Sequence, residues 1–381
     1  MFDAATPALS RAEQIDWLRL IRSENVGPVT FRNLLAHYGS AREALEVLPE
    51  LSRRGGRKRP VKVCSRSRAE RELAELEARG VRLLALGSDA YPPALAAIDD
   101  APPLLFVQGH AGLLQRPGVA VVGARNASAN GRRMARELGA ALAAHGYLVI
   151  SGLARGIDAA AHAGALEDGT AAVMAGGIDV VYPPENESLY GEIAERGLLL
   201  AEHALGTEPQ ARHFPRRNRL ISGMAQGVVV VEGAQRSGSL ISARLAGEQG
   251  REVMAVPGSP LDPRSSGCNR LLKQGAGLVE KPDDVVRILR EQTVPGPAEH
   301  RDDNFNAAGT TGASPDEATL DAARREVTEL MGSAPVAVDE IMRECQFSPS
   351  IVTMVLLELE LAGHCERHPG NRVALVQPGT D

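Results

Sequence analysis

The nine residues G-V-A-V-V-G-A-R-N (118–126) read as a buried strand that ends in a tight turn. An uninterrupted apolar run, Val119 to Val122, leads directly to Gly123, and a helical stretch, 131–145, follows. Continuous apolar residues, rather than alternating ones, are typical of a strand that is covered on both faces of a parallel sheet. The stretch therefore predicts the first strand–turn–helix unit of an α/β fold.

The same pattern of apolar strand, glycine and helix recurs about six times. Its later strands are expected at 148–150, 171–174, 198–201, 228–231, 253–256 and 275–279. This repetition predicts a doubly wound, mostly parallel sheet. Because parallel strands end at one edge, the glycines after them should line one concave rim, where backbone amides can approach an anion. These glycines are Gly123, Gly152, Gly176, Gly233, Gly238 and Gly258.

A cluster of cationic residues precedes the apolar run 228–231. It reads H-F-P-R-R-N-R-L-I-S-G (213–223) and contains no acid. We expect a short helix at the rim of the sheet that binds an anionic ligand. Arg216 and Arg219 are three residues apart and should share the face toward the ligand. Arg217 or Asn218 should then hold the rim in shape.

Two common anionic cofactors are excluded by their fingerprints. A dinucleotide site needs G-x-G-x-x-G and an acid after the second strand, whereas here the first turn reads G-A-R-N-A-S and the second strand ends in Ser151. The P-loop pattern G-x-x-x-x-G-K-[S/T] does not occur. The histidines at 162, 203 and 213 are separated, and the serines at 237 and 239 have no evident His–Asp partners. We therefore expect no cofactor, no metal and no catalytic residue.

Composition and segmentation predict four parts: a helical domain with a basic linker (1–65), the sheet domain (66–290), a flexible linker (291–316) and a winged-helix-like domain (317–381). The N-terminal turn at Gly27-Pro28 suits either a helix-hairpin-helix domain, which would contact phosphates, or a SAM-like bundle, which would bind protein. The segment 52–71 holds nine basic residues and one acid, and it is either a solvated linker or a nonspecific phosphate contact.

The third helix of the winged-helix-like domain, S-P-S-I-V-T-M-V-L-L-E-L-E-L (348–361), contains no Lys or Arg. It lacks the cations that groove readers use, so we expect it to dock protein rather than read DNA. A reading as a sequence-specific transcription factor conflicts with this composition. The formal net charge of −6 means that any nucleic-acid footprint must be local. The four dispersed cysteines, and a sequence without a signal peptide or membrane-length apolar run, favour a cytoplasmic protein.

Several motifs, in order, closely resemble one family. They are V-V-G-A-R, S-G-L-A-R-G-I-D-A-A-A-H, G-G-I-D-V-V-Y-P-P-E-N, F-P-R-R-N-R-L-I-S-G, S-G-S-L-I-S-A and G-R-E-V-M-A-V-P-G with S-S-G-C-N-R-L-L-K-Q-G-A. From about Tyr91 to Gly277 the chain resembles the bacterial DNA-processing protein DprA (Smf) family. The resemblance implies an extended Rossmann-like domain that binds single-stranded DNA without catalysis, and a homodimer that loads the RecA recombinase during natural transformation.

The resemblance also implies where DNA would bind. Residues 123–125 would be the phosphate turn, in which Ala124 replaces the usual serine, and Pro184 stands where some relatives carry a lysine. Phe214 is the one aromatic placed to stack on a base, and an aromatic content of only 3% favours binding dominated by phosphates. The candidate DNA-binding residues are Gly123, Ala124, Arg125, Ser151, Gly152, Arg155, Phe214, Arg216, Arg217, Asn218, Arg219, Ser237, Gly238 and Ser239.

An enzyme remains as the alternative. Phosphoribohydrolases with a related Rossmann-like sheet cleave nucleotides at a similar glycine rim, using a glutamate near P-G-G-x-G-T. Glu232-Gly233 and Ser237-Gly238 occupy comparable places here, although P-G-G-x-G-T itself is absent.

Overall fold

The computed structural model describes residues 9–292, 317–368 and 370–376. The chain divides into two compact units. One is the sheet unit, residues 70–292, and the other combines residues 11–69 with the C-terminal residues from 317 onward. Helix α4 (Arg66–Ala78) crosses the point at which the chain passes from one unit to the other.

The sheet unit is built on nine strands in the order β1-β2-β6-β5-β4-β3-β7-β8-β9. Their bounds are β1 Arg82–Ala85, β2 Leu104–Gly109, β3 Gly118–Val122, β4 Leu148–Ser151, β5 Thr170–Val173, β6 Leu198–Ala201, β7 Gly227–Val230, β8 Glu252–Ala255 and β9 Gly277–Leu278. The block from β6 to β9 is parallel, while β2 pairs antiparallel with both β1 and β6. The prediction of a mostly parallel, Rossmann-like sheet is confirmed.

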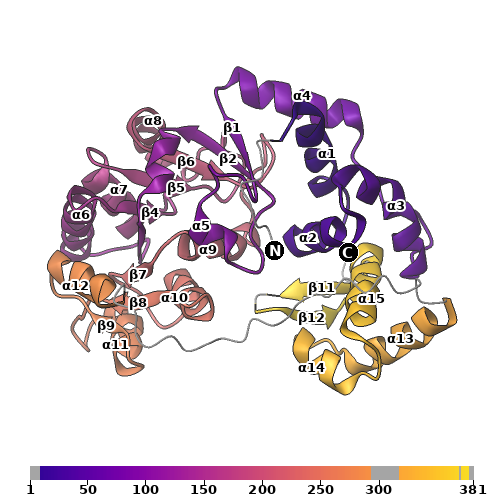
Figure 1. The fold of residues 1–381 in the computed structure, drawn as a ribbon. Helices are drawn as coiled ribbons and strands as arrows, with labels where there is room; N and C mark the ends of the chain where they lie inside the picture. Colours follow the sequence, from indigo (N-terminus) through magenta and orange to yellow (C-terminus); the bar gives the residue numbers. More distant parts are fainter. Residues whose placement is uncertain (1–8, 293–316, 369, 377–381) are drawn as a thin grey trace. The chain divides into compact units, whose positions relative to one another are not determined.

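Helices follow the strands as the sequence pattern predicts. They are α5 Pro93–Ala96, α6 Ala129–Ala144, α7 Ile157–Ala165, α8 Glu187–Arg196, α9 His213–Gly223, α10 Gly238–Glu248, α11 Ser266–Lys273 and α12 Pro282–Gln292. Figure 1 shows α6 and α7 side by side. Their close approach depends on Gly139, where a Cβ would lie 2.3 Å from the carbonyl oxygen of Ala161. These two helices and α12 share one apolar core with the strands, which fixes the sheet that carries the site.

The strand order reverses between β3 and β7. From β3 the chain winds through β4 and β5 to β6, whereas from β7 it winds the opposite way through β8 to β9. In open α/β sheets, ligands bind beyond the carboxyl ends of the strands, near such a reversal. The turns after β3, β4, β5 and β7 are therefore the places to look for a site.

The second unit contains two helical parts. Its N-terminal helices are α1 Arg11–Ile21, α2 Pro28–Tyr38 and α3 Ala41–Arg54. Its C-terminal part contains α13 Glu317–Leu330, α14 Val338–Glu344 and α15 Pro349–Ala362, with strands β10 Val336–Ala337, β11 Cys365–His368 and β12 Arg372–Leu375 in the order β10-β12-β11. Three helices and a small antiparallel sheet form a winged helix, as predicted.

The basic segment 52–71 is ordered where a solvated linker was one expectation. Its beginning completes α3 and its end starts α4. Between these helices, Glu24 forms an ion pair with Arg57 at 2.6 Å and accepts a hydrogen bond from the backbone N–H of Lys62 at 3.1 Å. The Arg57 guanidinium, followed by the Lys62 backbone bond, holds the pKa of Glu24 below its ordinary value. These contacts fix Arg57 and Lys62, two of the basic residues, against the turn that follows α1.

Candidate functional site

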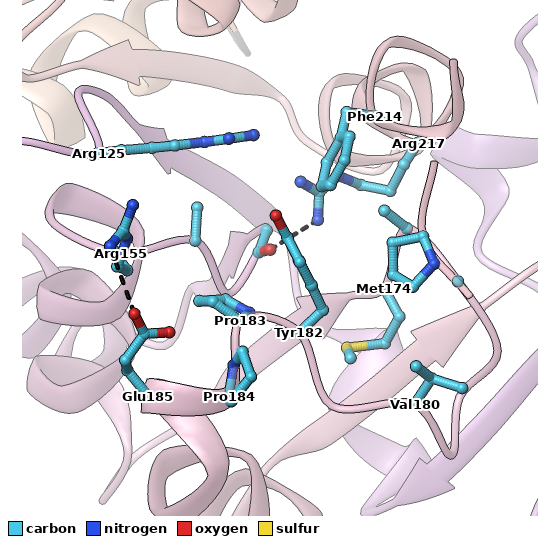
Figure 2. A pocket seen from close by; sticks show the side chains of 15 residues that line it. Arg125, Arg155, Met174, Val180, Tyr182, Pro183, Pro184, Glu185, Phe214 and Arg217 are labelled. Atoms are coloured by element: carbon cyan, nitrogen blue, oxygen red, sulfur yellow. Dashed lines mark hydrogen bonds and ion pairs between the residues drawn. The ribbon is translucent and has the colours of Figure 1, made fainter. Parts of the chain in front are cut away.

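A cavity of about 230 Å³ opens beside the ends of β4 and β5. Its lining combines two exposed arginines, an aromatic pair and a proline-rich loop (Figure 2). The lining residues are Arg125, Gly152, Ala154, Arg155, Met174, Ala175, Gly176, Val180, Tyr182, Pro183, Pro184, Glu185, Pro209, Phe214 and Arg217. The cavity thus brings together the turns after three neighbouring strands and the first turn of α9.

Arg125 and Phe214 face each other across this cavity (Figure 2). The Arg125 guanidinium carbon lies 5.1 Å from the centre of the Phe214 ring, and the ring of Tyr182 lies 5.6 Å from that of Phe214. Tyr182 is 42% exposed, which is unusual for a large apolar ring. An exposed cation beside two rings can hold a phosphate and a base at once. Sequence reasoning placed Arg125 and Phe214 in the site and missed Tyr182, although Y-P-P-E-N marked its loop.

Arg155 follows β4 and points toward Glu185 (Figure 2). Their ion pair is 3.3 Å long, and both side chains are more than half exposed. An exposed pair of this kind contributes at most about 1 kcal/mol, so it opens easily when a stronger anion arrives. Arg155 is therefore a second cation available to a ligand, with an acid that competes for it.

Arg217 is buried beneath the cavity and holds its floor together. Its Nη1 donates to the carbonyl oxygen of Gly152, at 2.7 Å, and to that of Val173, which joins the ends of β4 and β5. A Cβ on Gly152 would lie 2.5 Å from this guanidinium, so a larger residue there would have to displace Arg217 from its two acceptors. Burial lowers the pKa of Arg217 to about 10, although the charge of Asp158 opposes the shift. The expectation that Arg217 shapes the rim agrees with these contacts.

A buried polar network extends this floor. Asp158 accepts from the Gly152 N–H at 3.1 Å, and His162 Nε2 accepts from the N–H of Leu153 at 3.3 Å. Leu153 has φ of 53°, a left-handed conformation that is costly for leucine and needs such support. Burial lowers the pKa of His162 to about 3, with the charge of Arg217 acting in the same direction, so the imidazole is neutral. The two amides of the loop are thus used internally and are not offered to a ligand.

The remaining residues of α9 are divided between surface and interior. Arg216 is exposed, and Asn218 Nδ2 contacts the carbonyl oxygen of Gly238 at 3.4 Å. Arg219 is 6% exposed and forms ion pairs with Glu202 and with Asp100, the latter at 3.4 Å. The expectation that Arg219 faces the ligand is therefore wrong, because two acids from other segments bind its guanidinium inside the protein.

Four more candidates from the sequence lie outside the cavity lining: Ser151, Ser237, Gly238 and Ser239. The Ser151 hydroxyl is fully buried and donates to the carbonyl oxygen of Val121 at 2.6 Å. The expectation that Ser151 contacts the ligand is therefore wrong. The hydroxyls of Ser237 and Ser239 lie 2.7 Å apart at the N-terminus of α10, where Ser237 caps the helix. Gly238 between them is exposed.

The helix entrance after β3 is closed by the protein itself. Glu232, just beyond β7, accepts hydrogen bonds from the Ser128 N–H at 2.9 Å and from the Ser128 hydroxyl at 2.5 Å. The same hydroxyl accepts from Gly131 N and caps α6. A nucleotide-binding sheet places a phosphate at this helix N-terminus. Here a carboxylate fills the position, which explains structurally why the dinucleotide fingerprint is missing.

Metal sites and membrane-spanning helices were also sought among the described residues. No group of three or more His, Cys, Asp or Glu in residues 9–292, 317–368 and 370–376 is arranged to hold a metal ion. Within the same ranges, no helix combines the length and the apolar character required to cross a bilayer.

A Rossmann-like sheet with an arginine-lined cavity beside the carboxyl ends of its strands, preceded in the chain by helices and followed by a winged helix, is the domain combination of a recognisable class of protein. The family model for DNA recombination-mediator protein A matches residues 82–290. Models for the DprA-like N-terminal HHH domain and the DprA winged helix domain match residues 11–74 and 311–371. The chain therefore belongs to the DprA (Smf) family of DNA recombination mediators, and its N-terminal part is the helix-hairpin-helix alternative.

Curated relatives agree with this assignment. The chain is 40% identical to protein Smf of Escherichia coli over 314 residues, which cover 81% of this chain and 82% of the relative. It is 46% identical to DNA processing protein DprA of Streptococcus pneumoniae over 200 residues, which cover 52% and 71%.

Two solved structures are similar as well. The fold matches that of DprA from S. pneumoniae with a TM-score of 0.61 and 34% identity, over 74% of this chain and 98% of that one. It also matches DNA processing protein A from Helicobacter pylori, whose structure concerns a single-stranded DNA binding mode, with a TM-score of 0.51 and 29% identity, over 56% and 96%.

Proposed function

We propose that this chain binds single-stranded DNA at the cavity and acts as a noncatalytic recombination mediator. The observation that carries the proposal is the cavity itself, where Arg125 and Arg155 are exposed beside the rings of Phe214 and Tyr182. Cationic side chains bind the phosphates of a DNA strand whatever its sequence, and aromatic rings stack on any base. The H. pylori relative described with a single-stranded DNA binding mode supports the same ligand.

The finer role follows the family resemblance. We propose that the protein works in the cytoplasm as a homodimer, protects incoming single strands and loads RecA onto them during natural transformation. Membership of a recombination-mediator family supports this role. The test is to add the protein to RecA and single-stranded DNA coated with a single-strand binding protein. Faster RecA filament formation is expected, and no acceleration by a protein that still binds DNA would remove the loading step from the proposal.

The DNA site itself is tested with Arg125→Ala. We expect single-strand affinity to fall about tenfold, because one charge-assisted contact is lost. The slope of log affinity against log salt should decrease by about 0.7. The measurement is fluorescence anisotropy with oligo-dT over a salt series.

Arg196→Ala is the matched control for this experiment. Arg196 ends α8, directly before β6 begins, so it lies at the amino edge of the parallel strands and away from the cavity. Like Arg155, it is an exposed arginine paired with a glutamate, in this instance Glu167. Its replacement should change neither affinity nor slope. If Arg125→Ala behaves like this control, the cavity is not the DNA site.

The phosphoribohydrolase alternative depends on Glu232. That carboxylate accepts two hydrogen bonds from Ser128, so no lone reactive acid faces the cavity from this position. Incubation with AMP should release no adenine. Turnover that Glu232→Gln abolishes would support the enzyme instead.

A further inference from the structure

Helix α15, the third helix of the winged helix, is buried on two sides. One side joins the winged-helix core through Val352, Val355, Leu356 and Leu359. Leu357, Glu358, Leu361 and Ala362 lie outside that core cluster, and they are 1%, 0%, 0% and 8% exposed. A helix that packs on one core keeps a polar face toward water, whereas a helix that is apolar all round is covered all round. The second side of α15 therefore has a partner.

The partner is the N-terminal helical part of the same unit. A Cβ added to Gly55, the residue after α3, would lie 2.1 Å from the carbonyl oxygen of Glu358 and 2.8 Å from the Cβ of Ala362. The Nδ2 of Asn25, in the turn between α1 and α2, donates to the carbonyl oxygen of Leu361 at 3.1 Å. At Gly55, backbone thus lies directly against the backbone of α15, which requires a specific fit.

The buried acid at this contact, Glu358, is paired within the protein through Oε2, while its Oε1 has no hydrogen-bond partner among the described residues. The fully buried Glu358 receives the guanidinium of Arg324 at 2.6 Å. Its charge also acts across the contact on Tyr38 of α2: burial raises the pKa of that phenol, and Glu358 adds to the rise while Arg54 opposes it. A buried carboxylate that is paired with a cation is typical of a covered face rather than of one that faces solvent.

We infer that α15 is a docking helix whose partner is the N-terminal helical part, residues 11–64, of the same chain. Docking withholds the helix from nucleic acid, since a groove reader must present an exposed face to base edges. The inference does not rest on the proposed function of the cavity, which lies in the other unit. It gives the winged helix a defined role, that of joining the two ends of the chain in one folded unit.

Gly55→Leu in the full-length protein tests the docking. Gly55 has φ of −66°, which any residue adopts, so leucine strains only the contact with α15. Hydrogen–deuterium exchange should become at least about tenfold faster in α15, residues 355–362, once its partner is displaced. Exchange in α13 should stay unchanged, which shows that the winged helix remains folded. Single-strand affinity should stay within about twofold, because the cavity is unaffected.

Gly332→Leu is the matched control, because the nearest atom to an added Cβ is 3.9 Å away. If α15 exchanges equally fast in the parent protein and in Gly55→Leu, the docking inference is wrong.

If α13 also opens in Gly55→Leu, a second variant, Asn25→Gly, decides the question, because glycine tolerates the φ of 61° and only the bond to Leu361 is removed. Faster exchange confined to α15 then supports docking, and unchanged exchange overturns it. Protection that disappears on dilution would assign the contact to a second copy and would also overturn the inference.

Discussion

Two turns at the same edge of the sheet lead from a strand into a helix, and they differ in what occupies them. We call the turn after β3 the closed entrance and the turn after β4 the open entrance. After β3, the N-terminus of α6 holds the carboxylate of Glu232 through Ser128. After β4, the turn toward α7 leads to the open cavity, where Arg155 is exposed. Both turns follow the carboxyl end of a parallel strand, but the first holds an internal anion and the second carries an exposed cation. The first turn is therefore closed to an external anion by Glu232, while the second leads to a cavity with an exposed cation.

The open entrance depends on a buried cation, and replacing it should have the largest effect. Arg217→Met removes the donor to the carbonyl oxygens of Gly152 and Val173 while it keeps much of the side-chain volume. Two buried acceptors are left without their donor, which should lower the free energy of unfolding by about 3 kcal/mol. Single-strand affinity should fall by more than tenfold because the floor of the cavity is lost. Thermal denaturation and anisotropy measure the two effects.

Arg217→Lys is the informative companion. It keeps the charge but not the planar fork, so it should recover part of the stability and little of the affinity. If Arg217→Met leaves both the melting temperature and the affinity unchanged, the open entrance does not depend on a buried framework.

Replacing the acid of the closed entrance should lower stability without changing DNA affinity. Glu232→Gln keeps the shape of the side chain and removes the charge that accepts from Ser128 at the start of α6. The free energy of unfolding should fall by about 1 kcal/mol, because a charge-assisted cap is weakened. Single-strand affinity should not change. Glu137→Gln, an exposed position on the same helix, controls for the loss of one negative charge.

A loss of DNA affinity in Glu232→Gln that Glu137→Gln does not share would erase the difference between the two entrances. It would mean that DNA uses the N-terminus of α6 as well as the cavity.

The sheet and its flanking parts were predictable because they depend on local patterns. Apolar runs that end in glycine, such as Val119 to Gly123, identify strands without knowledge of any distant residue. The helix at 213–223 followed from the same reasoning. Each of these features needs only the residues within one element and the period of its apolar positions.

The direction of individual side chains in the site was not predictable in the same way. Helical spacing placed Arg216 and Arg219 on one face, but Arg219 is bound by Glu202 and Asp100, which lie 17 and 119 residues away. Ser151 is the last residue of a strand, where a rim residue is expected, yet its hydroxyl donates to the carbonyl oxygen of Val121 on the neighbouring strand. Tyr182 became a candidate only when the fold brought it beside Phe214. Long-range partners decide such cases, and one sequence does not reveal them.

The smallest expected effect concerns the acid at the open entrance. Glu185 pairs with Arg155 at 3.3 Å on the rim of the cavity, where a DNA phosphate would have to displace it. Glu185→Gln should therefore raise single-strand affinity about two- to threefold, since an exposed pair contributes less than about 1 kcal/mol. The salt slope should steepen slightly, because Arg155 then releases counterions when DNA binds. Glu167→Gln, which removes the acid of the matched pair with Arg196, should change neither quantity. An unchanged or lower affinity for Glu185→Gln would show that Arg155 does not meet phosphate, and Arg125, which reaches the cavity from the turn after β3, would then be the cation left to hold DNA there.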